Sequence, residues 1–242
     1  MPAKGEAEGS YVPGEPPPAG KSMHRVQEGL WRELLNMGVF VETALRLSVS
    51  VLCEGRLDLV DEVRAEEAEI DRWEVRIETE CLRLLALYGL VASDLRRVIA
   101  AFKVNRELEG LSDIAENLAK RARKLHKEPA AAPYLPQLGS LAEDAMRVVE
   151  QALNALKNVD ASLARRVITA DNAVDRNRAI LLAQLKQAVR DEPDRVSTWL
   201  RLINSARNIE RAAEHGASIA QAVIYLKEGT YPINVEPGEF GD

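Results

Sequence analysis

A near-repeat separated by 101 positions constrains the fold of this 242-residue chain more than any other feature. The stretch NRELEGLSDIAENLA is echoed further along by RNIERAAEHGASIA, so that Glu210 and Glu214 stand where the first copy has Glu109 and Asp113. Each copy sets two acids four residues apart, which places both on one face of a helix. Such a duplication predicts two copies of one structural unit.

The apolar residues are spaced for helices, and no run alternates as a strand would. Hydrophobic residues make up 46% of the chain and charged residues 29%, as in a folded protein. A stripe with steps of three and four runs from Ala101 to Leu125 and reappears from Leu202 to Leu226. We therefore expect an all-α protein of two tandem three-helix bundles related by internal duplication. The expected helices cover 25–54, 57–88, 93–126, 135–157, 160–190 and 191–229.

Composition divides the chain into four parts. Pro, Gly and Glu dominate 1–22 without periodicity, which predicts a disordered tail. Three prolines in 128–136 mark the boundary between the repeats, which we expect at 23–128 and 134–230. A C-terminal tail, 231–242, follows the second repeat.

Residues suited to helix ends support this division. Gly55 and Gly229 can adopt the left-handed conformation that ends a helix. Ser93 and Asp160 are suitable N-caps for the helices that follow them. Pro193, preceded by two acids, is a further helix-start signal, because proline and acids favour the first turn.

Charge and cysteine content exclude several classes of protein. The net charge is −6, whereas a nucleic-acid binder usually carries a basic face, so we expect no nucleic acid as a partner. Cys53 and Cys81 lie in apolar helical patterns, which predicts buried, reduced thiols in a cytoplasmic protein. No apolar run approaches the ~20 residues of a membrane span and no signal peptide is recognisable, so we expect no direct membrane insertion.

Each repeat carries one more acid pair, on its second helix. In an antiparallel hairpin, residues equidistant from the turn lie level with one another. The turn signals at 89–93 and 191–193 lie midway between these pairs and the acids of the repeated stretch. We therefore expect each hairpin to gather four carboxylates at one level. They are Glu67, Asp71, Glu109 and Asp113 in the first repeat, and Asp171, Asp175, Glu210 and Glu214 in the second.

Four unpaired carboxylates held together repel one another strongly. A hard divalent or trivalent cation with oxygen ligands would resolve this, with Fe, Mn, Mg and Zn as candidates. The alternative is that interleaved arginines neutralise each cluster. The arginines within reach in sequence are Arg72, Arg106, Arg176, Arg207 and Arg211. Only His215 among the histidines is near an acidic cluster, and we expect it at the surface or behind a ligand rather than on a metal.

The sequence carries no readable catalytic constellation. It has no Ser-His-Asp or Cys-His arrangement and no Gly-rich loop for a phosphate. The Glu-x-x-His motif of ferritin-like metal centres is absent, since Lys21, Arg123 and Ala212 precede the three histidines by three positions. We therefore expect a binding protein and no enzyme. Two alternatives stay open: a metal-dependent enzyme or metal-storage bundle, and an inert scaffold whose acidic faces are only solvated.

The acidic stretches resemble a known signature. Glu109–Ala119 resembles the LERIGDxAxNIA sequence of the PhoU family, and so does Ile209–Ala220, followed by a closing VIYLKEG. Asp94-Leu95-Arg96 matches the family's DLR, and the acid pairs on the second helix of each repeat match its paired-acid motif. The resemblance covers about 25–230. The departures from the signature are Gly110, Leu111, Ser112, Glu214 and Ser218.

The resemblance implies a fold, a cofactor and partners. PhoU-like proteins are paired three-helix bundles, and some bind iron, zinc or other metals through these acids. They are negative regulators that link the high-affinity phosphate ABC transporter to a two-component sensor histidine kinase. The resemblance therefore implies a cytoplasmic adaptor, with the transporter's cytoplasmic subunits and the kinase as partners, and it allows a homodimer. The longer Glu214 in place of Asp keeps the charge but alters the second site.

Overall fold

The computed structural model describes residues 23–230, which are helical almost throughout. Six α-helices and three short 3-10 helices follow one another in this part of the chain, and no strand occurs in it, which confirms the expected all-α fold. The tails expected at 1–22 and 231–242 lie outside the described residues. The helices are α1 Met23–Glu54, α2 Val60–Leu87, α3 Ala92–Leu125, α4 Leu135–Asn158, α5 Ala161–Asp191 and α6 Val196–Glu228.

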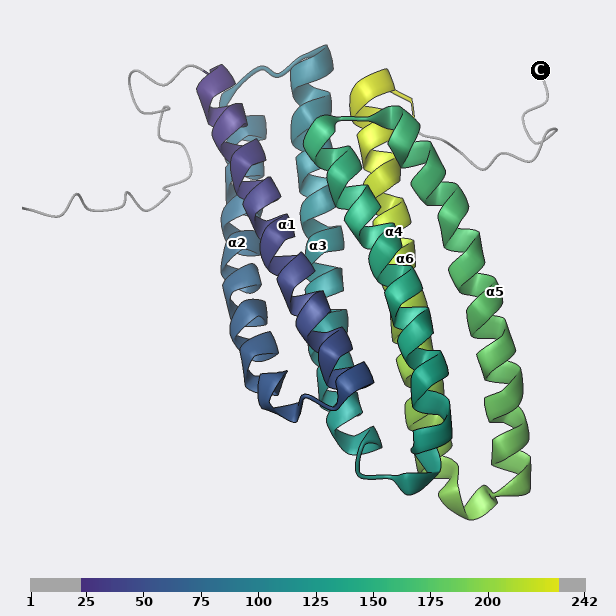
Figure 1. Cartoon of the computed structure of the whole chain (residues 1–242). Coiled ribbons are helices and arrows are strands. Elements are labelled where there is room, and N and C mark those ends of the chain that lie inside the picture. Colours follow the sequence, from purple (N-terminus) through teal and green to yellow (C-terminus); the bar gives the residue numbers. More distant parts are fainter. Residues whose placement is uncertain (1–22, 231–242) are drawn as a thin grey trace, which may run out of the picture.

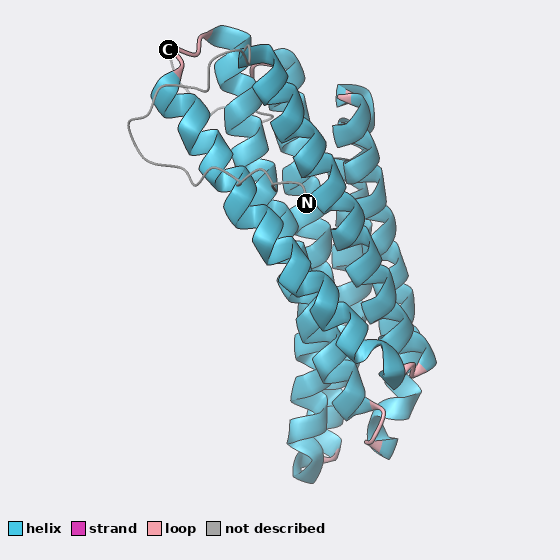
Figure 2. Ribbon diagram, turned by 90° about the vertical axis from the view of Figure 1, so that its left-hand side faces the viewer, coloured by secondary structure: helices cyan, strands magenta, loops and turns pink. Residues whose placement is uncertain are grey.

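The helices run alternately up and down and form two antiparallel three-helix bundles (Figure 1). Helices α1, α2 and α3 pack against one another, and so do α4, α5 and α6. The bundles meet where α1 packs on α4 and α3 packs on α6, which gives one elongated body (Figure 2). Helices α2 and α5 lie at its opposite outer edges (Figure 1).

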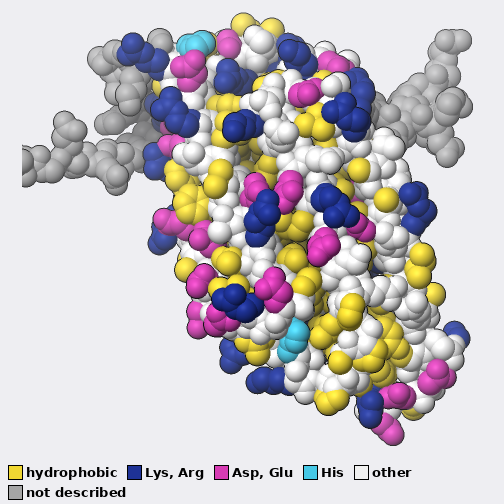
Figure 3. Space-filling view, in the orientation of Figure 1, with side chains coloured by type: hydrophobic (Ala, Val, Ile, Leu, Met, Phe, Trp, Pro, Cys, Tyr) yellow, Lys and Arg dark blue, Asp and Glu magenta, His cyan; other side chains and the backbone are white. Residues whose placement is uncertain are grey.

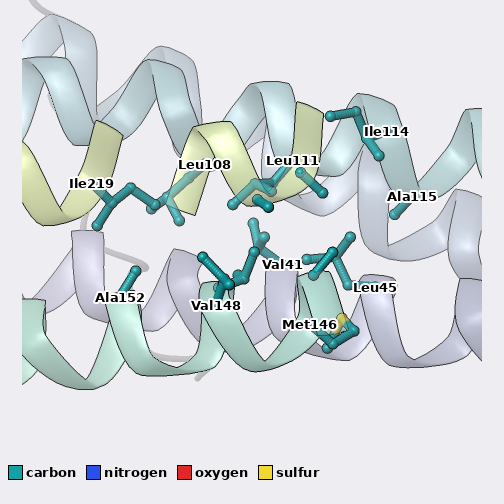
Figure 4. Packing of buried hydrophobic residues seen from close by; sticks show 14 of the residues in the cluster. Val41, Leu45, Leu108, Leu111, Ile114, Ala115, Met146, Val148, Ala152 and Ile219 are labelled. Carbon is teal, nitrogen blue, oxygen red and sulfur yellow. The ribbon is translucent and has the colours of Figure 1, made fainter. Parts of the chain in front are cut away.

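One continuous hydrophobic core runs through both bundles. Every member of the predicted stripe on α3, from Ala101 to Leu125, is buried. Side chains from α3 and α6 also meet those of α1 and α4 in the middle of the molecule, where Leu108 and Leu111 face Val41 and Val148 (Figure 4). The bundles therefore share apolar surface, and the contribution of that burial to stability belongs to both repeats.

The helix ends agree with the sequence signals in three cases and disagree in one, and the fifth signal, Pro193, begins the short 3-10 helix Pro193–Arg195 that precedes α6. Asp160 caps α5, because its Oδ1 accepts hydrogen bonds from the backbone N–H groups of Ser162 and Leu163. Gly55 and Gly229 have φ angles of +69° and +80°, as left-handed helix stops require. The N-cap predicted at Ser93 is wrong, because α3 begins one residue earlier, at Ala92, with no side-chain cap.

Helix α1 corrects the expectation that the chain holds no apolar run long enough to span a membrane. By length and composition it is long and apolar enough to cross a membrane, although the sequence was expected to hold no such run. Its apolar face packs into the core, where Leu34, Met37 and Val41 are fully buried, as in a core helix.

The two cysteines differ in burial. The thiol of Cys81, on α2, is buried as predicted, and burial raises its pKa to about 12. Cys53 is exposed in the last turn of α1, so its predicted burial is wrong.

Candidate functional site: two carboxylate clusters

The acids predicted in the first repeat come together along the groove between α2 and α3. Burial raises the pKa of Glu67, and nearby carboxylates, among them Asp71 and Asp113, raise it further. Burial likewise raises the pKa of Glu109, and the charges of Asp113 and Asp71 add to the shift. These mutual effects show that the four carboxylates share one electrostatic neighbourhood, with α2 acids acting on α3 acids and the reverse.

A fifth acid, Glu74, belongs to the same neighbourhood. It lies on α2 one turn beyond Asp71, and its charge is among those that raise the pKa of Glu109. Burial raises the pKa of Glu74 itself, with Glu78 and Asp71 as further causes. The spacing of three residues after Asp71 places it on the same helix face and could have identified it from the sequence. We call Glu67, Asp71, Glu74, Glu109 and Asp113 the first cluster.

A buried amide lies beside the first cluster. Asn105 is one turn before Glu109 on α3 and only 1% exposed. Its Nδ2 donates a hydrogen bond of 3.0 Å to the backbone carbonyl of Glu74, which ties α3 to α2 at this level. Its Oδ1 is buried without a hydrogen-bond partner among the described residues. An unpaired buried carbonyl oxygen is costly and is an oxygen of the type that hard cations accept.

Basic residues balance the end of the cluster nearest Glu116. This carboxylate pairs with Lys120, and the guanidinium Nε of Arg64 lies 3.8 Å from its Oε1. Arg106 lies near Glu109, and its charge lowers the pKa of that carboxyl against the larger effects that raise it. Between described residues, no ion pair within 4.0 Å engages any of the five acids of the first cluster.

The second cluster consists of the four predicted acids between α5 and α6: Asp171, Asp175, Glu210 and Glu214. Burial raises the pKa of Asp171 to about 6, and Asp175 and Glu214 contribute to the shift. The structure adds a cation that the sequence reasoning missed, because Arg178 Nε lies 2.8 Å from Glu210 Oε2. Neutralisation by arginine, the alternative to metal, therefore applies to this cluster through Arg178 rather than through the arginines expected.

The two clusters lie in corresponding hairpins but offer different groups to a cation. Within residues 23–230, no three His, Cys, Asp or Glu side chains converge closely enough to hold an ion as they stand. The first cluster nevertheless offers only oxygen donors from neighbouring helix turns, which suits a hard cation once the carboxylate rotamers close on it. In the second cluster one of the four acids is already engaged by Arg178.

His215 connects the two bundles. Its Nδ1 donates to Glu107 Oε2 at 2.7 Å, from α6 to α3. The ring packs against Gly110, where a Cβ atom would lie 2.6 Å from the ring Cε1. The departure from the signature at Gly110 therefore has a steric reason. The expectation that His215 is not a metal ligand stays a prediction.

A polar cleft of about 280 Å³ lies between α3 and α6, next to the first cluster. Glu109 and Asp113 line it on the α3 side, and Arg211 and His215 on the α6 side. The face over α1 and α4 is different, since acidic and basic side chains are interspersed there with apolar ones (Figure 3). The cleft therefore brings two acids of the first cluster opposite basic side chains of α6.

The fold and the site define a class: duplicated all-α proteins in which two packed three-helix bundles each carry a carboxylate cluster in the hairpin of their last two helices. The sequence model of the PhoU domain matches residues 34–122 and 138–223, one match in each bundle. The chain belongs to the PhoU family.

Individual relatives agree with this assignment. The chain is 33% identical over 203 residues to the phosphate-specific transport system accessory protein PhoU homolog of Pseudomonas aeruginosa, covering 84% of each protein. It is 33% identical over 197 residues to the homolog of Aquifex aeolicus, covering 81% of this chain and 89% of that protein. The crystal structure of PhoU from Pseudomonas aeruginosa aligns with a TM-score of 0.79 over 86% of this chain and all of the other. A PhoU crystal structure from Streptococcus pneumoniae, 22% identical, has the same fold, with a TM-score of 0.77.

Proposed function

We propose that this protein is a negative regulator of phosphate uptake that acts in the cytoplasm as an adaptor. It would link the cytoplasmic subunits of a phosphate ABC transporter to a sensor histidine kinase. The observation that carries the proposal is the match to the PhoU domain in both bundles, together with relatives named as accessory proteins of phosphate-specific transport systems. The elongated body of two bundles offers separate surfaces for two partners (Figure 2).

A bound cation is the second part of the proposal. Glu67, Asp71, Glu109 and Asp113, with Glu74 beside them, would hold a divalent or trivalent ion, and Asp171, Asp175, Glu210 and Glu214 are the corresponding acids of the second bundle. The ion, when bound, neutralises the carboxylates and turns a negative surface into one that accepts anionic groups of a partner. The raised pKa values of Glu67 and Glu109 support this, because burial and neighbouring carboxylates outweigh the charges of Lys120 and Arg106, which oppose the rise.

Free phosphate is a poor ligand for the protein without metal. Glu109 and Asp113 line the cleft together with Arg106 and Arg211, and their carboxylates repel an anion there. We therefore place regulation in protein contacts whose strength depends on the bound cation, and we assign no catalytic step. A metal-dependent oxidase or phosphatase is the competing function, and an assay of both activities on metal-loaded protein separates it from the adaptor.

Recovery of partners from membranes tests the proposal. Tagged protein is mixed with solubilised membranes of its own organism, with and without chelator, and elemental analysis is made of protein purified without chelator or nickel. We expect the transporter's cytoplasmic subunits or the kinase to be recovered, and less of either in chelator. Recovery of neither, with no metal in the purified protein, favours the inert scaffold. Tight binding of phosphate to metal-free protein in calorimetry contradicts the mechanism.

A further inference from the structure

In the second cluster a guanidinium pairs directly with one of the acids, whereas no ion pair within 4.0 Å engages the acids of the first cluster among the described residues. Arg178 on α5 and Glu210 on α6 form their ion pair at 2.8 Å with side chains only 23% and 14% exposed. The contact is a charge pair without hydrogen-bond geometry, since Arg178 Nε is buried without a hydrogen-bond partner among the described residues. A guanidinium this close to a mostly buried carboxylate supplies the positive charge that a bound ion would otherwise supply. Burial raises the pKa of Glu210, and the charge of Arg178 opposes this rise.

The register of the repeats shows which residue Arg178 replaces. A constant shift of 104 positions carries the acid pair of α2 onto that of α5, and it carries the buried Ile77 onto the buried Leu181. The same shift carries Glu74 onto Arg178. A negative side chain of the first cluster therefore corresponds to a positive one in the second.

An oxygen donor is also lost between α3 and α6. With the shift of 101 positions, Asn105 corresponds to Ala206. Asn105 is the buried amide whose Oδ1 has no partner among the described residues. The second cluster thus has fewer oxygen ligands as well as an added positive charge, and both differences weaken the binding of a cation.

We infer that the two bundles have different cation capacities: a divalent cation binds at the first cluster, and Arg178 keeps it out of the second. This inference rests on the proposed cation site of the first cluster. To bind at the second, an ion must displace the guanidinium from Glu210 and overcome its repulsion. The rest of the second cluster is suited to binding, since Asp171 Oδ1 is buried without a hydrogen-bond partner among the described residues. Removal of the guanidinium should therefore be sufficient to open a site.

Manganese titration of the full chain tests this. Chelator-treated protein is titrated with Mn²⁺, and binding is followed by calorimetry and by the electron paramagnetic resonance of free Mn²⁺. To isolate the second bundle, Arg178→Glu is placed in the Asp71→Ala/Asp113→Ala background. We expect wild type to bind Mn²⁺ at the first cluster alone, the background variant to lose this binding, and Arg178→Glu to create a new site at least about tenfold tighter than any residual binding.

Arg176→Glu in the same background is the matched control. Arg176 is exposed on the same helix, and the change in net charge is identical. An equal gain in Mn²⁺ affinity for both variants overturns the inference, because it would reflect total charge and not the Arg178–Glu210 pair. Arg178→Gln serves as the second variant if Arg178→Glu loses helical circular dichroism.

The outcomes separate this inference from the proposed function. If wild type binds Mn²⁺ equally at both clusters, the cation site stands and the role of Arg178 is wrong. If wild type and the background variant bind none and Arg178→Glu does, the role of Arg178 stands and the first cluster is not a cation site. If no variant binds Mn²⁺, both are overturned.

Discussion

The α2–α3 hairpin and the α5–α6 hairpin have the same fold and corresponding acid pairs, but they differ in the positive charge that offsets the repulsion between their carboxylates. In the first, five acids and a buried amide lie together, and no described residue forms an ion pair with those acids. In the second, Arg178 pairs with Glu210. The duplication therefore preserved the arrangement of the helices while one position, Glu74 or Arg178, came to carry opposite charge. An intact acid motif on a duplicated helix does not by itself indicate an equivalent site.

The largest expected effect comes from removing ligands of the first cluster. Asp71→Ala with Asp113→Ala should abolish cation binding by this bundle, a loss of at least about 100-fold, and leave the helices folded, since fewer like charges remain. Metal content and circular dichroism in metal-free buffer measure both parts. Asp61→Ala with Glu62→Ala removes two exposed acids from the first turn of α2 as a control. Unchanged metal content in the first variant, or a loss of helix, contradicts the prediction.

A second prediction makes the first cluster resemble the second. Glu74→Arg should lower its Mn²⁺ affinity by about tenfold, because a guanidinium would compete with the ion for the carboxylates of α2 and α3. Calorimetry of the metal-free variant measures the change. Glu62→Arg, at the exposed start of α2, has the same change in charge and should have much less effect. If both substitutions weaken binding equally, total charge and not the cluster determines affinity.

A third prediction concerns a difference between α3 and α6 at the bundle interface, where Gly110 corresponds to Arg211. Gly110→Ala should destabilise the protein by about 1 kcal/mol, because the new Cβ displaces the His215 ring and breaks its bond to Glu107. Chemical denaturation measures the loss. In a His215→Ala background the same substitution should be neutral or stabilising, since alanine favours a helix over glycine. An equal cost in both backgrounds would remove the steric explanation.

The smallest expected effect is a pH dependence in the second cluster. The pKa of Asp171 is about 6 in the folded protein, above the value of 3.8 for an unperturbed group. The folded state therefore binds this proton at a higher pH than the unfolded state does. The contribution to stability is then fully present below about pH 4 and is lost as the pH rises through 6. Asp171→Asn should remove this slope and raise stability at pH 8 by less than about 1 kcal/mol, allowing for solvent screening. Denaturation in chelator from pH 4 to 8 measures it, with Asp61→Asn as a control that should keep the slope.

Much of the fold and part of the site could be predicted from the sequence. Apolar spacing identified the six helices and the α3 stripe, and the equal distances from the turns identified which acids of α2 and α3 share a neighbourhood. The cap at Ser93 and the burial of Cys53 were wrong, because both depend on where a helix ends to within one turn. Glu74 lies three residues after Asp71, on the same helix face but outside the spacing of four that the predicted pairs share. The use of these acids as metal ligands stays a prediction.

The sequence by itself determined the helical periodicity, the duplication and the placement of acids on helix faces, because these depend on contacts between residues one or two turns apart. Only the tertiary structure decided that Arg178 pairs with Glu210 and that His215 of α6 reaches Glu107 of α3, 108 positions away. Both contacts depend on which helix faces meet and at what level. The packing of the two bundles sets this geometry, which the spacing within a helix cannot specify.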